Sequence, residues 1–201
     1  PMNTFKRAFL PALVLCLLFF LGDAVYLYRS RLQTGSLRMT VLDVGQGASA
    51  VFRLPGGRVV LVDGGGFYDH SFDEGKYVVA PHLWHERLDT VDVVVLTHPH
   101  PDHLNGLLYI LEHFHVREIW TNGDPAEGDT GAIFNEIVRR KKIPLKHLSH
   151  KDSREFGGVR VEILNPPSRD GGPADRSSSF DETNDRALVM RWTFQNVHFL
   201  L

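Results

Sequence analysis

The chain has 201 residues and a nearly balanced charge, with 22 Lys and Arg against 24 Asp and Glu. This balance argues against a generic polyanion-binding protein, because non-specific affinity for nucleic acid comes from an excess of Lys and Arg facing phosphates. The single cysteine, Cys16, excludes an internal disulfide and a CxxC zinc knuckle, so any metal must be held by His, Asp, Glu or Asn side chains.

The first predicted element is an apolar segment at residues 8–28, preceded by a short flank at 1–7 that is cytoplasmic or part of a loop. Its length is close to the roughly 20 residues that a helix needs to cross a bilayer. Three interpretations are open: a retained transmembrane helix or signal anchor, a secretory signal cleaved after Ala24, and a buried helix of a soluble domain. We favour the transmembrane helix, because a run this long with so few polar residues is unusual in a soluble helix.

The segment 37–62 is typical of β-structure. Its short apolar runs are separated by the glycine-rich turns "GQGA" and "PGGR". Three strands with such tight connections predict an antiparallel meander.

Helices and strands then alternate. The apolar, β-branched run at 91–97 predicts a strand covered on both faces. Apolar spacing predicts helices at 78–88, 104–114 and 130–142, and two more strands lie in "VREIWTNG" and "PLKHLS".

The last part of the chain contains the strand "GVRVEILNPP", a polar loop of about 17 residues, and a hairpin formed by "ALVMRWTF" and "VHFLL". A loop of that length is usually a functional rim or a disordered segment. Because the chain ends at Leu201 within an apparent strand, we expect the domain at 37–201 to be incomplete.

The stretch "THPHPDH", residues 97–103, lies between a predicted strand and a predicted helix. Sites in layered α/β folds are usually built at this end of a strand. His98 and His100 are two residues apart in extended backbone, so they project to the same side and can share one ion. Asp102 and His103 follow one turn later and can reach a second ion.

This donor set of imidazoles and a carboxylate suits Zn²⁺, Mn²⁺ or Fe. Two such ions about 3.5–4 Å apart activate water and stabilise the leaving oxygen in many hydrolases. The simpler interpretation, Asp102 as the N-cap of the helix, explains the aspartate but not the three histidines.

The motif "HPHPDH" resembles the H-x-H-x-D-H motif of the metallo-β-lactamase superfamily, and Asp63 in "VVLVDGG" matches an aspartate that supports its metal ligands. The resemblance implies an α/β fold, a four-layered αβ/βα sandwich that is truncated here at its C-terminus and preceded by one transmembrane helix. It also implies two divalent metal ions, Zn or Mn, held by His98, His100, Asp102 and His103, with Asp102 and Asp63 as the catalytic residues.

The segments "LRMTVLDVGQG" and "ETNDRALVMRW" are similar to parts of the ComEC-type DNA-uptake competence proteins. This narrower resemblance implies a membrane-associated, metal-dependent nuclease that acts on the DNA strand that is not imported. It implies DNA, the membrane and other competence proteins as partners. It also implies a location at the bacterial inner or cytoplasmic membrane, with the domain on the extracytoplasmic side.

The chain departs from that branch at Ala48, His100, Asp185 and Ala187, and the remaining metal ligands of the superfamily, an aspartate and a later histidine, are expected beyond Leu201. Two alternatives therefore stay open. One is a secreted or anchored metallo-hydrolase of a small ester, lactone or β-lactam, and the other is a catalytically inactive gate domain of a DNA channel.

Several further residues have two interpretations each. Asp43 is a turn former or a support for the ligands, and His147 and His150 are surface residues or distal ligands. The basic cluster at 138–142 is a solvated helix end or a groove for the DNA backbone. Asn184 is expected near the metals on the resemblance alone.

Overall fold

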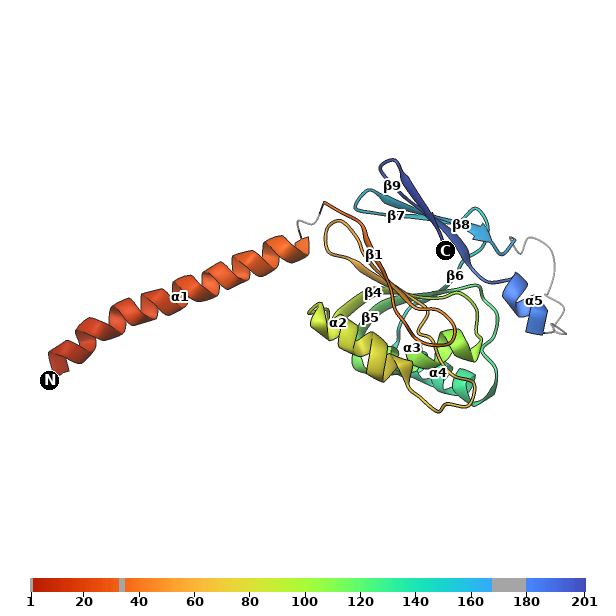
Figure 1. Ribbon diagram of the computed structural model, residues 1–201, viewed down its shortest axis with the longest axis horizontal. Helices are drawn as coiled ribbons and strands as arrows, with labels where there is room; N and C mark the ends of the chain where they lie inside the picture. The colour runs from red at the N-terminus through yellow and green to blue at the C-terminus, as the bar shows by residue number, and fades with distance from the viewer. Residues whose placement is uncertain (1, 33–34, 168–179) are drawn as a thin grey trace.

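The computed structural model describes residues 2–32, 35–167 and 180–201. Helix α1 (Met2–Leu32) projects from a mixed α/β domain (Figure 1). Within α1, the segment Phe9–Tyr28 is long and apolar enough to cross a membrane, judged by length and composition, and none of it is buried against the rest of the protein. The buried-helix interpretation of residues 8–28 is therefore wrong, while the membrane helix and the cleaved signal both remain predictions.

The first sheet has six strands in the order β1-β2-β3-β4-β5-β6. The strands are β1 (Arg38–Val41), β2 (Ala50–Arg53), β3 (Val59–Val62), β4 (Thr90–Leu96), β5 (His115–Thr121) and β6 (Leu145–His147). The pairs β1–β2 and β2–β3 are antiparallel, which confirms the predicted meander. The pairs from β3 to β6 are parallel, so the carboxyl ends of β3, β4, β5 and β6 meet at one edge.

Helices cover one face of this sheet (Figure 1). They are η1 (Gly75–Val79), which is a π-helical segment, α2 (Ala80–His85), α3 (Pro101–His113) and α4 (Gly128–Lys141). Helix α3 begins at Pro101 rather than at the predicted position 104, because proline suits the first turn of a helix, where its missing N–H is not needed. Asp102 and His103 therefore belong to the first helical turn.

The second sheet has four antiparallel strands in the order β10-β9-β8-β7. They are β7 (Ser153–Phe156), β8 (Val159–Asn165), β9 (Val189–Phe194) and β10 (Val197–Leu200). The sequence did not indicate β7, because this edge strand has a largely polar sequence that lacks an apolar alternation. The short helix α5 (Phe180–Asp185) lies in the predicted polar loop, and residues 168–179 of that loop lie outside the described residues.

Two hydrophobic cores lie on either side of the first sheet. Val91 and Val94 of β4 pack in the core under the helices, whereas Val93 and Val95 pack in the core between the sheets. This arrangement confirms a strand covered on both faces. The described residues thus form three layers, helices on sheet on sheet, and the second helical layer of the expected four-layered sandwich is not formed by them.

The start of α3 is fixed directly on the loop that follows β3. The N–H of Gly64 donates to the carbonyl of His103 at 2.8 Å, and the N–H of Gly106 donates to the carbonyl of Gly65 at 3.0 Å. A Cβ atom at Gly106 would lie 2.0 Å from the carbonyl oxygen of Gly64. Only a glycine at position 106 permits this approach, which sets the position of His103 relative to β3.

We predict that Gly106→Ala destabilises the domain by about 2 kcal/mol or more, because an added methyl group in a packed contact forces the backbone apart. The free energy of unfolding in denaturant measures this. Gly35→Ala is the control, since a Cβ atom there meets nothing within 4 Å. Equal stability of the two variants would contradict the prediction.

Candidate metal centre

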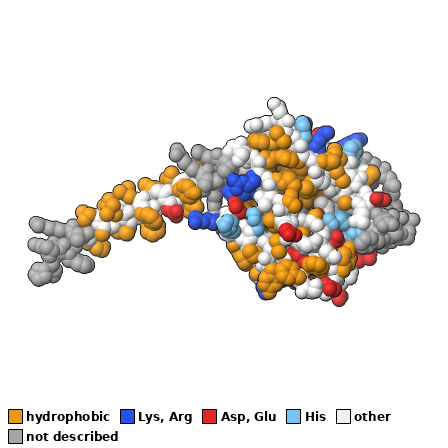
Figure 2. Space-filling model, viewed as in Figure 1, with side chains coloured by type: hydrophobic (Ala, Val, Ile, Leu, Met, Phe, Trp, Pro, Cys, Tyr) orange, Lys and Arg blue, Asp and Glu red, His pale blue; other side chains and the backbone are white. Residues whose placement is uncertain are grey.

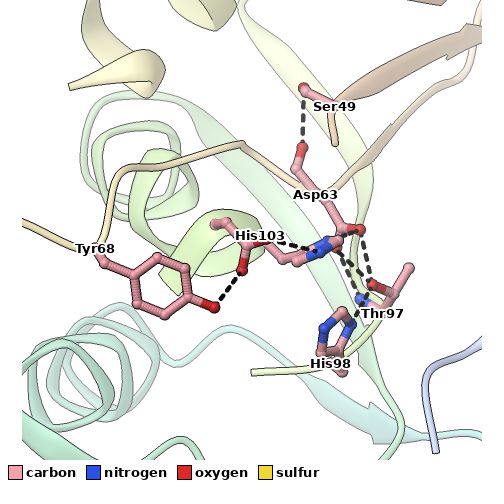
Figure 3. Close-up of polar contacts among 7 residues, drawn as sticks. Ser49, Asp63, Tyr68, Thr97, His98 and His103 are labelled. Atoms are coloured by element: carbon pink, nitrogen blue, oxygen red, sulfur yellow. Dashed lines mark hydrogen bonds and ion pairs between the residues drawn. The ribbon is translucent and has the colours of Figure 1, made fainter. Parts of the chain in front are cut away.

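The predicted site residues lie at the carboxyl ends of β3 and β4 and in the first turn of α3 (Figure 3). The structure brings together the residues of both sequence motifs, although they are 34 or more positions apart: Asp63, Thr97, His98, His100, Asp102 and His103. The motifs "VVLVDGG" and "HPHPDH" are thus in direct contact in the fold, and their role as one metal site remains a prediction.

Asp63 is the centre of this arrangement and is 1% exposed. Its backbone has a φ of 55°, an uncommon conformation for a residue other than glycine, and such strain is typical of functional sites. The Ser49 hydroxyl donates to the Asp63 carbonyl at 3.0 Å. In the side chain, Oδ1 accepts the N–H of Thr97 at 2.8 Å and Oδ2 accepts the Thr97 hydroxyl at 2.7 Å. The carboxylate therefore has a fixed orientation.

His103 is oriented by this carboxylate. Its Nδ1 lies 2.7 Å from Asp63 Oδ2 and donates to it, which leaves the Nε2 lone pair available as a metal ligand. Burial lowers the pKa of His103, but the hydrogen bond and charge of Asp63, together with the charge of Asp102, outweigh burial and raise the pKa above its ordinary value. The Asp63–His103 pair is thus a carboxylate–imidazole support of the kind that accompanies metal-binding histidines.

Thr97 links His98 to the same carboxylate and determines which ring nitrogen of His98 carries the proton. The single hydroxyl proton of Thr97 goes to Asp63, so the oxygen can only accept from Nδ1 of His98, 3.1 Å away. The Nε2 atom of His98 is then an unprotonated acceptor, and it is buried without a hydrogen-bond partner. Burial, followed by the nearby His103 and His100, lowers the pKa of His98 to about 4, so its imidazole is neutral near pH 7.

His100 completes a cluster of three imidazoles. The ring centroid of His98 lies 4.6 Å from that of His100 and 4.1 Å from that of His103. Burial is also the largest cause of a lowered pKa for His100. The Asn184 side chain reaches His98 and His100 closely enough to raise the pKa of each slightly, although Nε2 of His98 gains no well-formed hydrogen bond from it. Asn184 therefore lies beside the centre, where the resemblance placed it.

The segment that follows α5 is attached to the first sheet, and this places Asn184. Arg186 forms an ion pair with Asp124 at 2.7 Å, and the N–H of Leu188 donates to the carbonyl of Thr97 at 2.9 Å. The first contact joins this segment to the loop after β5, and the second joins it to the end of β4. Both contacts hold Asn184 at the carboxyl edge of the sheet.

Asp102 is held by Tyr68, which lies in the loop after β3. The Tyr68 hydroxyl donates to Asp102 Oδ1 at 3.1 Å, and Asp102 Oδ2 lies 3.6 Å from Nε2 of His103. Burial and the charge and hydrogen bond of Asp102 raise the pKa of Tyr68 to about 12, so the phenol stays protonated and remains a donor. One carboxylate oxygen is thus occupied and the other faces the imidazole cluster.

The donor atoms of these side chains are of the kind that bind a divalent metal ion. A buried, unpartnered Nε2 on His98 is costly unless a ligand satisfies it, and imidazoles with a carboxylate are the usual donors for zinc-like ions. Among the described residues, however, no group of three or more His, Cys, Asp or Glu side chains converges closely enough to hold an ion in the present conformation. His98, His100, Asp102 and His103 as ligands therefore remain a prediction.

Two other histidines considered from the sequence contact residues outside this cluster. Nδ1 of His147, at the end of β6, lies 2.9 Å from the Thr121 hydroxyl, and Nδ1 of His150 donates to the carbonyl of Leu164 at 3.1 Å. Asp43 is exposed and accepts the N–H of Gly45 at 3.3 Å, which matches a turn former.

The basic cluster at 138–142 forms a helix end. Arg140 pairs with Glu112 and Glu136, and Nζ of Lys141 donates to the carbonyl of Leu111 at 2.6 Å. This cluster lies at the end of α3 opposite to the metal centre. These contacts match the solvated helix end, and the groove for the DNA backbone remains a prediction.

Sequence reasoning did not identify three residues that shape the centre: Thr97, Tyr68 and Arg186. Thr97 adjoins the histidine motif, so its position next to His98 was a usable signal. Tyr68 and Arg186 act through contacts across 34 and 62 positions, respectively, with Asp102 and Asp124. Nothing in their local sequence indicates these partners.

The profile of the "Metallo-beta-lactamase superfamily" matches residues 42–187 of the chain. "ComE operon protein 3" of Bacillus subtilis is 24% identical over 178 residues, which is 83% of this chain and 22% of that protein. "Ribonuclease J" of Mycobacterium tuberculosis is 30% identical over 87 residues, or 40% of this chain and 15% of that protein. The chain thus spans less than a quarter of the length of these relatives.

A solved structure from Thermotoga maritima, assigned to the metallo-beta-lactamases, superposes with a TM-score of 0.50. The two sequences are 13% identical, and the match covers 82% of this chain and 77% of the other. This likeness supports the fold.

We predict that Asp63→Asn weakens binding of Zn²⁺ and Mn²⁺ by about 10- to 100-fold, because asparagine has one acceptor oxygen and cannot serve both Thr97 and His103. Isothermal titration calorimetry measures the affinity. Asp43→Asn is the matched control, since Asp43 is exposed and contacts only its own turn. Unchanged affinity in Asp63→Asn would contradict the role assigned to the carboxylate.

We predict a smaller effect for Tyr68→Phe, which removes the hydrogen bond to Asp102 and lets that carboxylate rotate. The loss of one such bond corresponds to a reduction in metal affinity of roughly 3- to 10-fold. The same titration applies, with Tyr77→Phe as control because the ring of Tyr77 packs against Phe72 instead. Equal affinities in the two variants would rule out a positioning role for Tyr68.

Proposed function

Because the chain belongs to the metallo-beta-lactamase superfamily, we propose that it is the hydrolytic domain of a membrane-anchored, metal-dependent nuclease of a DNA-uptake system. The observation that carries the proposal is the network of Asp63, Thr97, His98 and His103, which engages Nδ1 of both imidazoles and leaves Nε2 of each as the nitrogen that can bind a ligand. Imidazoles and a carboxylate placed together in this way are suited to bind the metal of a metal-dependent hydrolase.

The relatives support a phosphodiester as the bond that is cut. One relative is a ribonuclease, and the longer match is to a ComE operon protein, in agreement with the ComEC-type resemblance of "LDVGQG" and "ETNDRALVMRW". We infer DNA as the substrate, specifically the strand that is not imported. The membrane and other competence proteins are the remaining proposed partners.

The side chains of the site have different proposed roles. His98 and His100 would hold one divalent ion, Zn²⁺ or Mn²⁺, and Asp102 and His103 would hold a second. When bound, such ions act as Lewis acids toward water and a phosphoryl oxygen.

The other residues act on these ligands. Asp63 orients His103 directly and His98 through the Thr97 hydroxyl, and Tyr68 occupies one oxygen of Asp102. Burial keeps His98 and His100 neutral, so no proton competes with a metal for their ring nitrogens near pH 7. The chain's own residues thus keep the imidazoles of His98 and His100 neutral and place one oxygen of Asp102 beside Nε2 of His103.

The anchoring part of the proposal rests on α1. The segment Phe9–Tyr28 would cross the bacterial inner or cytoplasmic membrane, with the domain on the extracytoplasmic side. That arrangement would bring the hydrolytic site to DNA arriving at the cell surface.

The test is cleavage of end-labelled single- and double-stranded DNA by the full-length protein in the presence of Mn²⁺ or Zn²⁺. We expect the double variant Asp102→Ala/His103→Ala to lose more than about 100-fold in rate, because it removes two ligands rather than a supporting contact. His147→Ala is the control and should keep its activity, since His147 contacts Thr121 instead of the cluster.

Three other outcomes of this experiment would contradict the proposed function. Cleavage that is independent of metal, or equal in the double variant, would refute the mechanism. Hydrolysis of a lactone, thioester or β-lactam reporter without DNA cleavage would favour a hydrolase of small substrates. Binding of metal and DNA with no hydrolysis would favour a gate domain.

A further inference from the structure

The end of the domain opposite the metal centre is basic. Arg38 begins β1 and is paired in register with Arg53 at the end of β2, and Arg58 lies in the turn that follows. Arg117 is the third residue of β5. Because β3, β4 and β5 are parallel and the metal centre lies at their carboxyl ends, these arginines lie at the other edge of the sheet.

A pocket of about 360 Å³ lies at this end, lined by Arg53, Arg58 and Arg117 together with Asp89 and Asp92. Asp92 is already engaged, since one carboxylate oxygen accepts the N–H of Val59 at 2.9 Å and the other lies 3.4 Å from Arg117. Arg117 is nevertheless 63% exposed. The Arg117 guanidinium can therefore turn toward an anion in the pocket, whereas Arg53 is paired with Glu86 at 2.5 Å and Arg58 lies over the Phe156 ring.

Helix α4 adds further positive charge at the same end. Its last turn contains Arg139, Arg140 and Lys141, and Lys142 follows. Lys141 contacts the carbonyl oxygens of Leu111 and Glu112 at the end of α3, which places this turn beside the start of β5. Figure 2 shows a group of Lys and Arg side chains on the side of the domain that faces α1.

The other end of the domain, around the candidate metal centre, carries acidic side chains. The loops around the metal centre contain Asp43, Asp69, Asp102 and Asp124. The domain thus has a basic end and an acidic end, separated by β4, whose seven residues span about 20 Å.

The chain itself limits how the domain can sit on a membrane. Six residue steps separate the end of α1 at Leu32 from Arg38, and they can span at most about 20 Å. This limit keeps the domain at the bilayer surface but permits either end to face it. The charges decide between the two orientations, since an anionic surface attracts arginine and lysine and repels the acidic end.

We propose that the basic end docks on anionic phospholipid headgroups, with a lipid phosphate in the pocket of Arg53, Arg58 and Arg117, and that the metal centre consequently faces away from the bilayer. Guanidinium groups suit this ligand, because they bind phosphate oxygens in a bidentate manner. The proposal rests on α1 lying in a bilayer and does not depend on hydrolytic activity.

The experiment uses the full chain in nanodiscs of phosphatidylglycerol and phosphatidylcholine that contain a lipid carrying a chelated gadolinium ion, because a hard ion of this kind has little affinity for the histidine cluster. Nitroxide labels are attached at Asn196→Cys or Ser71→Cys in a Cys16→Ser background. Asn196 lies in the β9–β10 turn at the basic end, where Phe194 pairs with Val159, and Ser71 lies three residues from Tyr68 at the other end. We expect gadolinium to enhance relaxation of the label at 196 and to leave the label at 71 largely unaffected.

Charge variants test the lipid contact. The double variant Arg58→Gln/Arg117→Gln should shift the equilibrium between the docked and the undocked domain by roughly 10- to 30-fold toward the undocked domain. This is the change in the equilibrium constant expected when two positive charges near an anionic surface are removed. The matched control, Lys146→Gln/Arg191→Gln, removes two exposed charges outside the pocket and should dock normally. Nanodiscs of phosphatidylcholine alone should abolish the difference between the labels.

Equal relaxation of the two labels, or stronger relaxation at 71, would overturn the proposal. Displacement of the docked state by a single-stranded oligonucleotide would identify the basic end as a nucleic-acid surface and would overturn it as well. Metal-dependent DNA cleavage is measured in the same nanodiscs. Docking without cleavage would refute only the proposed function, and cleavage without docking would refute only this inference.

Discussion

The arrangement of the candidate metal centre depends on one carboxylate, that of Asp63. Asp63 accepts the backbone N–H and the hydroxyl of Thr97 and the ring N–H of His103, and through the hydroxyl it also determines which nitrogen of His98 carries the proton. These bonds exist among the protein's own groups. The rings are therefore oriented before any ligand arrives, and less conformational entropy is lost when one binds.

The fold supplies the rigidity that this carboxylate requires. Asp63 ends a strand whose four residues are all buried, and its left-handed backbone turns the chain toward the first turn of α3. The close contact of Gly64 with Gly106 then fixes the distance between strand and helix. Strain at Asp63 persists because cores on both faces of the sheet hold the strand in place.

The sequence predicted those features that are encoded locally. The meander and the doubly covered strand at β4 follow from apolar periodicity. The grouping of Asp63 with the histidine motif follows instead from the resemblance to the metallo-β-lactamase superfamily. The strand β7 and the roles of Tyr68 and Arg186 could not be predicted, because a polar edge strand has no distinctive pattern and the partners of these two residues are distant in sequence. Helix α3 begins three residues before the predicted position 104, because apolar periodicity marks the buried face of the helix and not its first turn, where Pro101 lies.

The central claim, that Asp63 sets the protonation of both rings, can be measured by ¹⁵N-detected NMR of the histidine side chains in metal-free protein, at a pH about two units above the ordinary histidine pKa. The account predicts that His98 and His103 are both protonated on Nδ1, with Nε2 shifts characteristic of an unprotonated nitrogen. A proton on Nε2 of either ring, or rapid exchange between the two tautomers, would contradict it.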